Sequence, residues 1–105
     1  MTDISIVRAT FTDWSEAEPI VERMIAEGLA ACVNVEPRMR AIYRWQGNVE
    51  RTTETAALFK TTMALAQPLA DRIAELHSYD LPAIEIWPAA VSPALARWVD
   101  AETGA

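Results

Sequence analysis

The chain has 105 residues, 51% hydrophobic and 23% charged, a length that fits one domain over residues 1–105 and no second one. Nine Lys and Arg against fifteen Asp and Glu give a net charge of −6, which argues against nucleic-acid and anionic-membrane partners because both are bound by basic surfaces. A single cysteine, Cys32, permits no internal disulfide, and no apolar run is long enough to span a membrane. We therefore expect a cytoplasmic protein.

The chain begins with a predicted strand and helix. β-branched residues fill the segment 4–10, as is typical of a strand. From residue 17 onward apolar residues recur every three to four positions, which predicts an amphipathic helix that ends at Gly28. Pro19 argues against a regular first turn, because proline has no N–H to donate. We expect an irregular start to this helix, from Asp13.

The middle of the chain predicts one long hairpin. Segments 31–45 and 49–61 are rich in β-branched and aromatic residues, and only the short loop 46–48 separates them. Pro37 implies an edge, a bend or a bulge. Arms of this length span roughly 43–50 Å at about 3.3 Å per residue, more than twice an ordinary strand. An exposed ribbon tipped by Trp45 is prone to edge-to-edge pairing, so we expect it to pair with another copy of the chain.

The last third predicts a helix, a strand and a second helix. Apolar residues recur at helical spacing over 65–76, and a core strand is expected over 83–89, bounded by Pro82 and Pro88. Ser92, followed by a proline, opens a short terminal helix. The order is βαββαβ plus a helix, which predicts an α+β, ferredoxin-like sandwich with a long hairpin between its second and third strands.

The chain lacks the residues that several functions of ferredoxin-like domains require. An RNA-recognition domain needs a basic, aromatic third strand, whereas segment 49–55 is rich in Thr and Glu. A soft-metal chaperone needs two close thiolates, and the chain has one cysteine. Its three glycines stand singly, so no phosphate-binding loop is indicated. Function must therefore be argued from individual side chains.

Three side chains are candidates for a chemical role. Cys32 could be a nucleophile with His77 as its base, but its apolar strand entry is typical of a buried structural cysteine. We therefore assign no catalytic residue and expect no enzyme. His77 ends a helix, where an imidazole serves as a cap. Lys60, the only lysine, lies at a strand end, as an exposed edge charge would.

Five ordered blocks resemble the CutA family of divalent-cation tolerance proteins over about Ile4 to Val99. They are segments 29–35, 42–50, 58–62 and 76–82, and Trp98 in the last helix. The resemblance implies a homotrimer in which the hairpins pair between subunits and sites lie in clefts between chains. It also implies a non-enzymatic binding or signalling role in the tolerance of copper and other divalent metals.

The resemblance also implies a set of cleft residues. Trp45 and Glu50 match the family's hairpin tip, and Lys60 matches the lysine of its Lys-Thr-Thr block. His77 and Tyr79 match its His-Pro-Tyr turn. These five residues are the expected ligand site, with His77 as the expected ligand of a weakly bound copper ion. No required cofactor is expected.

Departures from the family pattern weaken the metal assignment. Each removes a ligand atom or a rigid turn, at Ala9, Gln46, Leu76, Ser78 and Ala83. A copper or zinc site needs three or four ligands, whereas one chain has a single histidine and a single cysteine. A pocket that includes a lysine suits a small anion equally well. The alternatives are therefore a PII-like sensor of an anionic metabolite and, after it, a purely structural scaffold.

Overall fold

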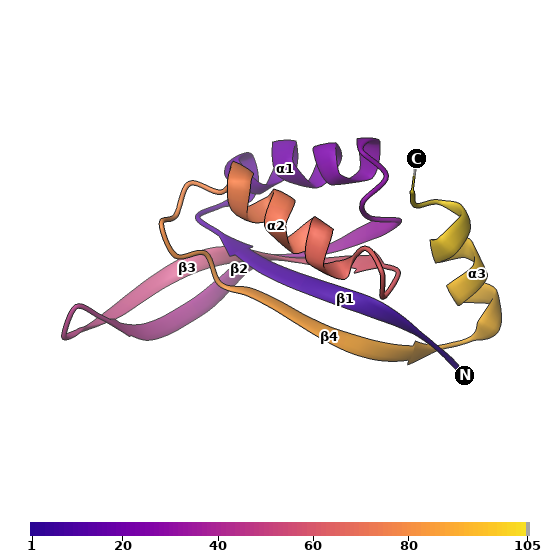
Figure 1. The fold of residues 1–105 in the computed structure, drawn as a ribbon. Helices are drawn as coiled ribbons and strands as arrows, with labels where there is room; N and C mark the ends of the chain where they lie inside the picture. Colours follow the sequence, from indigo (N-terminus) through magenta and orange to yellow (C-terminus); the bar gives the residue numbers. More distant parts are fainter. Residues whose placement is uncertain (105) are drawn as a thin grey trace.

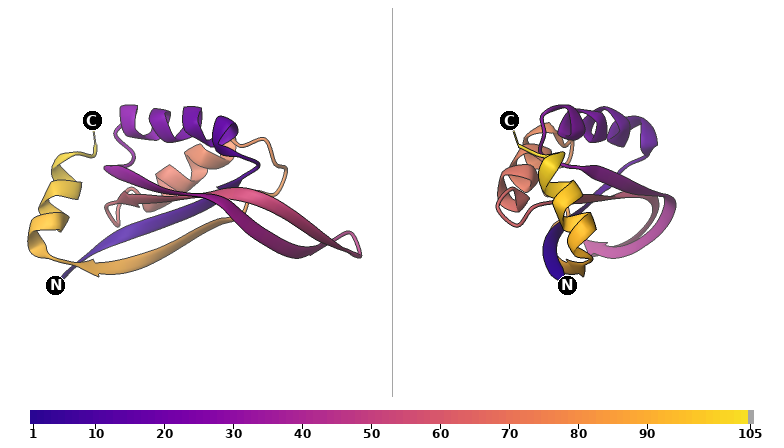
Figure 2. Two further views of the ribbon diagram at one scale, coloured as in Figure 1. Left: turned by 180° about the vertical axis from the view of Figure 1, so that it is seen from behind. Right: turned by 90° about the vertical axis from the view of Figure 1, so that its right-hand side faces the viewer.

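Seven elements make up the structure, a computed structural model that describes residues 1–104 (Figure 1). They are β1 (Thr2–Phe11), α1 (Trp14–Ala26), β2 (Cys32–Trp45), β3 (Asn48–Thr61), α2 (Ala66–Leu76), β4 (Ile84–Val91) and α3 (Pro93–Ala101). The strands form one antiparallel sheet in the order β2-β3-β1-β4. Helices α1 and α2 cover one face of it (Figures 1 and 2). The predicted order and fold class are confirmed.

The main core lies between the sheet and the two helices on it. Alternate residues of β1 point into it, among them Val7 and Phe11, and meet the apolar faces of α1 and α2 at Met24 and Ile73. The other face of β1 packs against α3, where Val99 is fully buried. Full burial of one such side chain contributes about 1.5–3 kcal/mol. Strand β1 is therefore covered on both faces and is the centre of the fold.

Helix α1 begins with a regular turn, so the expected irregular start was wrong. Asp13 is the N-cap, as expected, and its Oδ1 accepts the Glu16 N–H at 3.0 Å. Pro19 lies inside the helix. It deprives the Ser15 carbonyl of its usual partner, but both residues are exposed, so water can replace that hydrogen bond.

A bulge and a tight turn shape the hairpin. Strand β2 carries one extra residue between Glu36 and Met39, where Arg38 has φ +57°, so the bulge predicted from Pro37 is confirmed. Only Gln46 and Gly47 form the turn, both with positive φ, and Asn48 already pairs in β3. The loop is thus one residue shorter than predicted.

Strand β4 differs most from its prediction. It continues through Pro88 to Val91 and lies at the edge of the sheet, paired only with β1. An edge strand tolerates proline because it need not donate on its outer side. Ile86 is 42% and Trp87 is 38% exposed. The strand predicted over 83–89 is therefore present and runs two residues further, but the expectation that it lies in the core was wrong.

The outer half of the hairpin has no third strand beside it. Strand β1 pairs with β3 only over residues 55–61, so residues 39–45 and 48–54 form a two-stranded ribbon that extends past the body (Figures 1 and 2). Its large apolar side chains are between 41% and 69% exposed, namely Ile42, Tyr43, Trp45 and Val49. A two-stranded ribbon is at best marginally stable in water. The ribbon is therefore the part of the chain that most needs a partner.

Within residues 1–104, no helix has both the length and the hydropathy that crossing a membrane requires.

Gly28 fixes both the end of α1 and the path of the C-terminal segment. Its φ of +73° is left-handed, and a Cβ there would overlap the Gly104 carbonyl oxygen. The Gly104 N–H donates to the Gly28 carbonyl at 2.8 Å. Gly47 has φ +84° but open space around it, which makes it a matched control.

Gly28→Ala should therefore destabilise the protein more than Gly47→Ala. Both variants lose about 1–2 kcal/mol to the left-handed backbone, and Gly28→Ala loses about 1–3 kcal/mol more to overlap. Urea unfolding at one protein concentration measures the difference. In a chain truncated after Thr103, the additional loss of stability caused by Gly28→Ala should vanish. Equal losses of unfolding free energy in the two full-length variants would contradict the proposed overlap.

Candidate functional site

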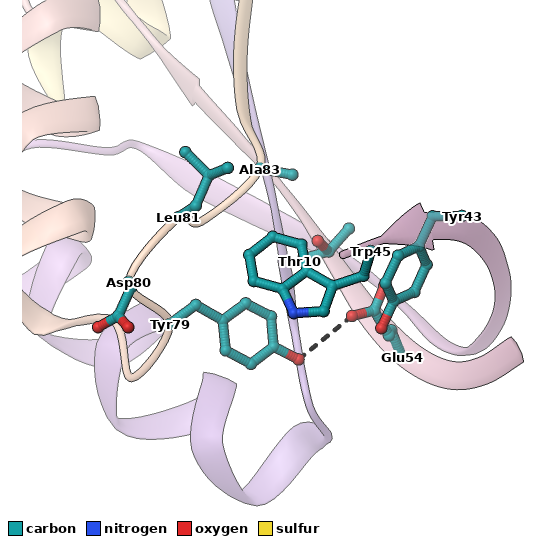
Figure 3. A pocket seen from close by; sticks show the side chains of 8 residues that line it. All are labelled: Thr10, Tyr43, Trp45, Glu54, Tyr79, Asp80, Leu81 and Ala83. Carbon is teal, nitrogen blue, oxygen red and sulfur yellow. Dashed lines mark hydrogen bonds between the residues drawn. The ribbon is translucent and has the colours of Figure 1, made fainter. Parts of the chain in front are cut away.

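A cleft of about 360 Å³ lies at the base of the ribbon, beside the end of β1 (Figure 3). Its lining comes from β1, β2, β3 and the loop between α2 and β4, and consists of Thr10, Tyr43, Trp45, Glu54, Tyr79, Asp80, Leu81 and Ala83. We call it the aromatic cleft. Its volume is within the usual range of small-molecule sites.

The hairpin geometry places the aromatic side chains. Tyr43 and Trp45 are two residues apart in β2, so they share one face of the strand. The bulge beside Pro37 bends and twists the ribbon, and residues beyond it line the same cleft as Thr10 of β1. Glu54 lies at the bulge, opposite Met39. A bulged hairpin can therefore supply three of the cleft residues.

Tyr79 connects the α2–β4 loop to β3 and to Thr12, the residue that follows β1. Its hydroxyl donates to Glu54 Oε2 at 3.2 Å and lies 3.1 Å from Thr12 Oγ1 (Figure 3 draws the first contact). Burial raises the pKa of Tyr79 above its ordinary value of 10.0, and the negative charge of Glu54 raises it further. The phenol is therefore neutral at pH 7 and donates to the carboxylate.

His77 supports the cleft from behind. Its side chain is fully buried and stacks on Phe11, with ring centroids 4.8 Å apart, and it contacts the Tyr79 ring at a tilt of 53°, with centroids 4.6 Å apart. Its Nδ1 accepts the Tyr79 N–H at 3.0 Å, and its Nε2 lies 2.7 Å from the Thr10 carbonyl oxygen. Because a carbonyl only accepts, Nε2 carries the proton. His77 thus joins the α2–β4 loop to β1 and positions Tyr79.

This geometry does not fit a metal ion at His77. A metal needs a nitrogen lone pair, but Nδ1 accepts a hydrogen bond and Nε2 carries a proton. Among residues 1–104 no three His, Cys, Asp or Glu side chains gather as a metal site would require. Ser78, which replaces the family's proline, donates instead to Glu16 Oε2 at 2.8 Å. The turn is therefore held by hydrogen bonds within the chain.

Two of the five expected ligand residues line the aromatic cleft, Trp45 and Tyr79. Glu50 pairs with Tyr43 farther along the ribbon and does not line it. Lys60 pairs with Ile6 and Cys32 at the opposite end of β3, six residues and roughly 20 Å from the position of Glu54. One chain alone therefore does not assemble the mixed-charge pocket, which the family resemblance places in a cleft between chains and which stays a prediction.

Sequence reasoning missed two residues that define the cleft, Tyr43 and Glu54. The spacing of Tyr43 and Trp45 was available as a signal, because residues two apart share a strand face. Glu54 gave no such signal, since its position depends on the bulge and on the place of the α2–β4 loop. Their presence makes the cleft aromatic and acidic.

Comparisons with known proteins agree with the fold. A family model described as CutA1 divalent ion tolerance protein matches residues 5–102. A divalent-cation tolerance protein CutA from Pyrococcus horikoshii is 46% identical over 79 residues, which are 75% of this chain and 76% of that one. The chloroplastic protein CutA of Arabidopsis thaliana is 30% identical over 79 residues, 75% of this chain and 43% of that one.

A crystal structure of CutA from Xylella fastidiosa superposes with a TM-score of 0.93 at 33% identity, covering 98% of this chain and 100% of that one. The similarity thus extends from sequence to the arrangement of all the elements.

The raised pKa of Tyr79 predicts a late step in an alkaline titration. The chain has two tyrosines, and subtracting the ultraviolet titration curve of Tyr79→Phe from that of the wild type should leave a step centred above pH 10.0. Because the folded-state pKa is raised, the neutral phenol stabilises the fold below pH 10 and loses this effect as the pH rises through that pKa. A step at or below pH 10 would contradict the contacts of Tyr79.

Proposed function

The chain belongs to the CutA1 divalent ion tolerance family, and from this premise we propose that it is a homotrimeric, non-enzymatic binding module of the cytoplasm. We further propose that it acts in a cell's response to copper and other divalent cations. The observation that carries the proposal is the exposed apolar ribbon, which a single chain leaves without support.

Free sheet edges support the assembly. The sheet ends in β2 on one side and β4 on the other, and apolar side chains are exposed on both strands, among them Ile42 and Trp87. Pairing between two different edges is heterologous, and repeated heterologous contacts form a closed ring when the rotation between neighbours divides a full turn. Three chains is the number that the family resemblance implies.

The placement of the reactive side chains supports binding rather than covalent catalysis. Both nitrogens of His77 are engaged with Thr10 and Tyr79. Cys32 pairs with Lys60, and lies four residues, roughly 13 Å, along β2 from Glu36, which is level with the Thr10 end of β1. The cysteine and the histidine are therefore not arranged as nucleophile and base.

The acidic lining argues against the anionic alternative. The charged residues that line the aromatic cleft, Glu54 and Asp80, are both acidic, while Lys60 lies near the end of β3 that is away from the ribbon. Any direct copper binding by this chain is weak, because residues 1–104 hold no set of three metal ligands. We infer that the response to divalent cations depends on the assembled trimer and its ligand rather than on a metal cage at His77.

The trimer should have a mass of about 35 kDa, three times the 11.6 kDa of the chain. Trp87→Glu should dissociate it, because a buried charge without a partner opposes association. Trp14 on α1 is 39% exposed, against 38% for Trp87, so Trp14→Glu is a matched control that should remain trimeric. Sedimentation equilibrium measures both masses, and a wild-type protein of 11.6 kDa at micromolar concentration would refute the assembly.

Cells that lack this chain should tolerate less copper than cells that carry it. Re-expression of the wild type or of Trp14→Glu should restore growth, while Trp87→Glu should not, because the proposed role requires the trimer. The readout is the copper concentration that halves the growth rate. Unchanged copper tolerance after deletion would contradict the proposed role.

A further inference from the structure

The walls of the aromatic cleft are suited to a positively charged organic group. Three aromatic side chains line it, those of Tyr43, Trp45 and Tyr79 (Figure 3). Tyr43 and Trp45 are 41% and 47% exposed and lie on the face of the ribbon opposite to Ile42 and Val49. A partner chain that covers Ile42 and Val49 therefore leaves parts of these rings open to a ligand. An aromatic face attracts a cation through its negative quadrupole, and tryptophan does so most strongly.

The charges at the cleft have one sign. Glu54 and Asp80 line it, and no lysine, arginine or histidine does so among the residues that the structure describes. The net charge of the whole chain, which includes these two residues, is −6. An anionic ligand would therefore meet repulsion and find no cationic partner, whereas a cation beside the aromatic rings would meet the carboxylate of Glu54; that of Asp80 points away from the rings (Figure 3).

The size of the cleft favours an organic cation over a bare metal ion. Its volume is about 360 Å³, whereas a metal needs several ligand atoms within about 2.0–2.6 Å of one point. Leu81 and Ala83 add apolar contacts to the lining. The cleft thus offers aromatic and apolar surface to the carbon atoms of a ligand and the Glu54 carboxylate to its charge.

The acidic group most firmly held in the cleft is Glu54. The Tyr79 hydroxyl donates to its Oε2 at 3.2 Å, and the backbone N–H of Tyr79 is fixed in turn by His77. Part of the cleft is therefore organised before a ligand arrives, which lowers the entropy lost on binding.

We propose that the aromatic cleft binds a small organic ammonium ion, held over the rings of Trp45, Tyr43 and Tyr79 and neutralised by Glu54. This assignment rests on the proposed function, since it names the ligand class of the binding module.

Calorimetry with two probes of one shape tests the proposal. Choline and its neutral analogue 3,3-dimethylbutan-1-ol differ in the charge of the ammonium group, so choline should bind the full-length protein at least about tenfold more tightly. Equal affinity would show that only apolar fit matters and would overturn the proposal. Binding of acetate in preference to choline, or displacement of choline by an equal concentration of Mg²⁺, would also overturn it.

Matched variants locate the site. Glu54→Gln should weaken choline binding about tenfold, while Glu22→Gln, which removes the same charge from the exposed side of α1, should change it less than about twofold. Trp45→Leu should weaken binding about tenfold, and Trp14→Leu should leave it unchanged. Trp45 is half-exposed, so this variant should keep the fold, which sedimentation checks. Equal effects in the paired variants would place the ligand elsewhere.

The two proposals fail separately. A trimer of about 35 kDa that does not prefer choline refutes the ligand class and leaves the assembly standing. A protein that binds choline but sediments at 11.6 kDa supports the ligand class and refutes the assembly.

Discussion

The constraint on which this structure depends is the mismatch between a long hairpin and a shorter central strand. Strands β2 and β3 have 14 residues each, whereas β1 has 10 and reaches β3 only over residues 55–61. The surplus leaves the sheet as a two-stranded ribbon with exposed apolar side chains. Such a ribbon is marginally stable alone, so it needs stabilising contacts from another chain.

The same ribbon creates the cleft at its base. The bulge beside Pro37 lets residues beyond it, Tyr43 and Trp45, line one cavity with the α2–β4 loop. His77 fixes the loop side of that cavity through two hydrogen bonds to backbone groups. A histidine that the family resemblance offered as a metal ligand is thus a structural residue in this chain. Its contribution to function is to hold Tyr79 against Glu54.

Local chemistry made much of the fold predictable, but strand order decided the rest. The cap at Asp13, the stop at Gly28 and the bulge at Pro37 follow from neighbouring residues, and the structure confirms them. The edge position of β4 depends on which strand lies beside β1, and so the exposure of this strand was missed. Within one chain Lys60 lies far from Tyr79 along β3, and a sequence motif does not show such a distance, because it depends on strand length and pairing.

Hydrogen exchange of the ribbon amides tests most directly the claim that other copies of the chain support the ribbon. If the account is right, the hydrogen-bonded amides of residues 39–45 and 48–54 exchange in the assembled wild type as slowly as those of β1, and in dissociated Trp87→Glu they exchange at least about a hundredfold faster, as local opening without a partner requires. Fast exchange of the ribbon in the wild type, beside a protected β1, would contradict the account.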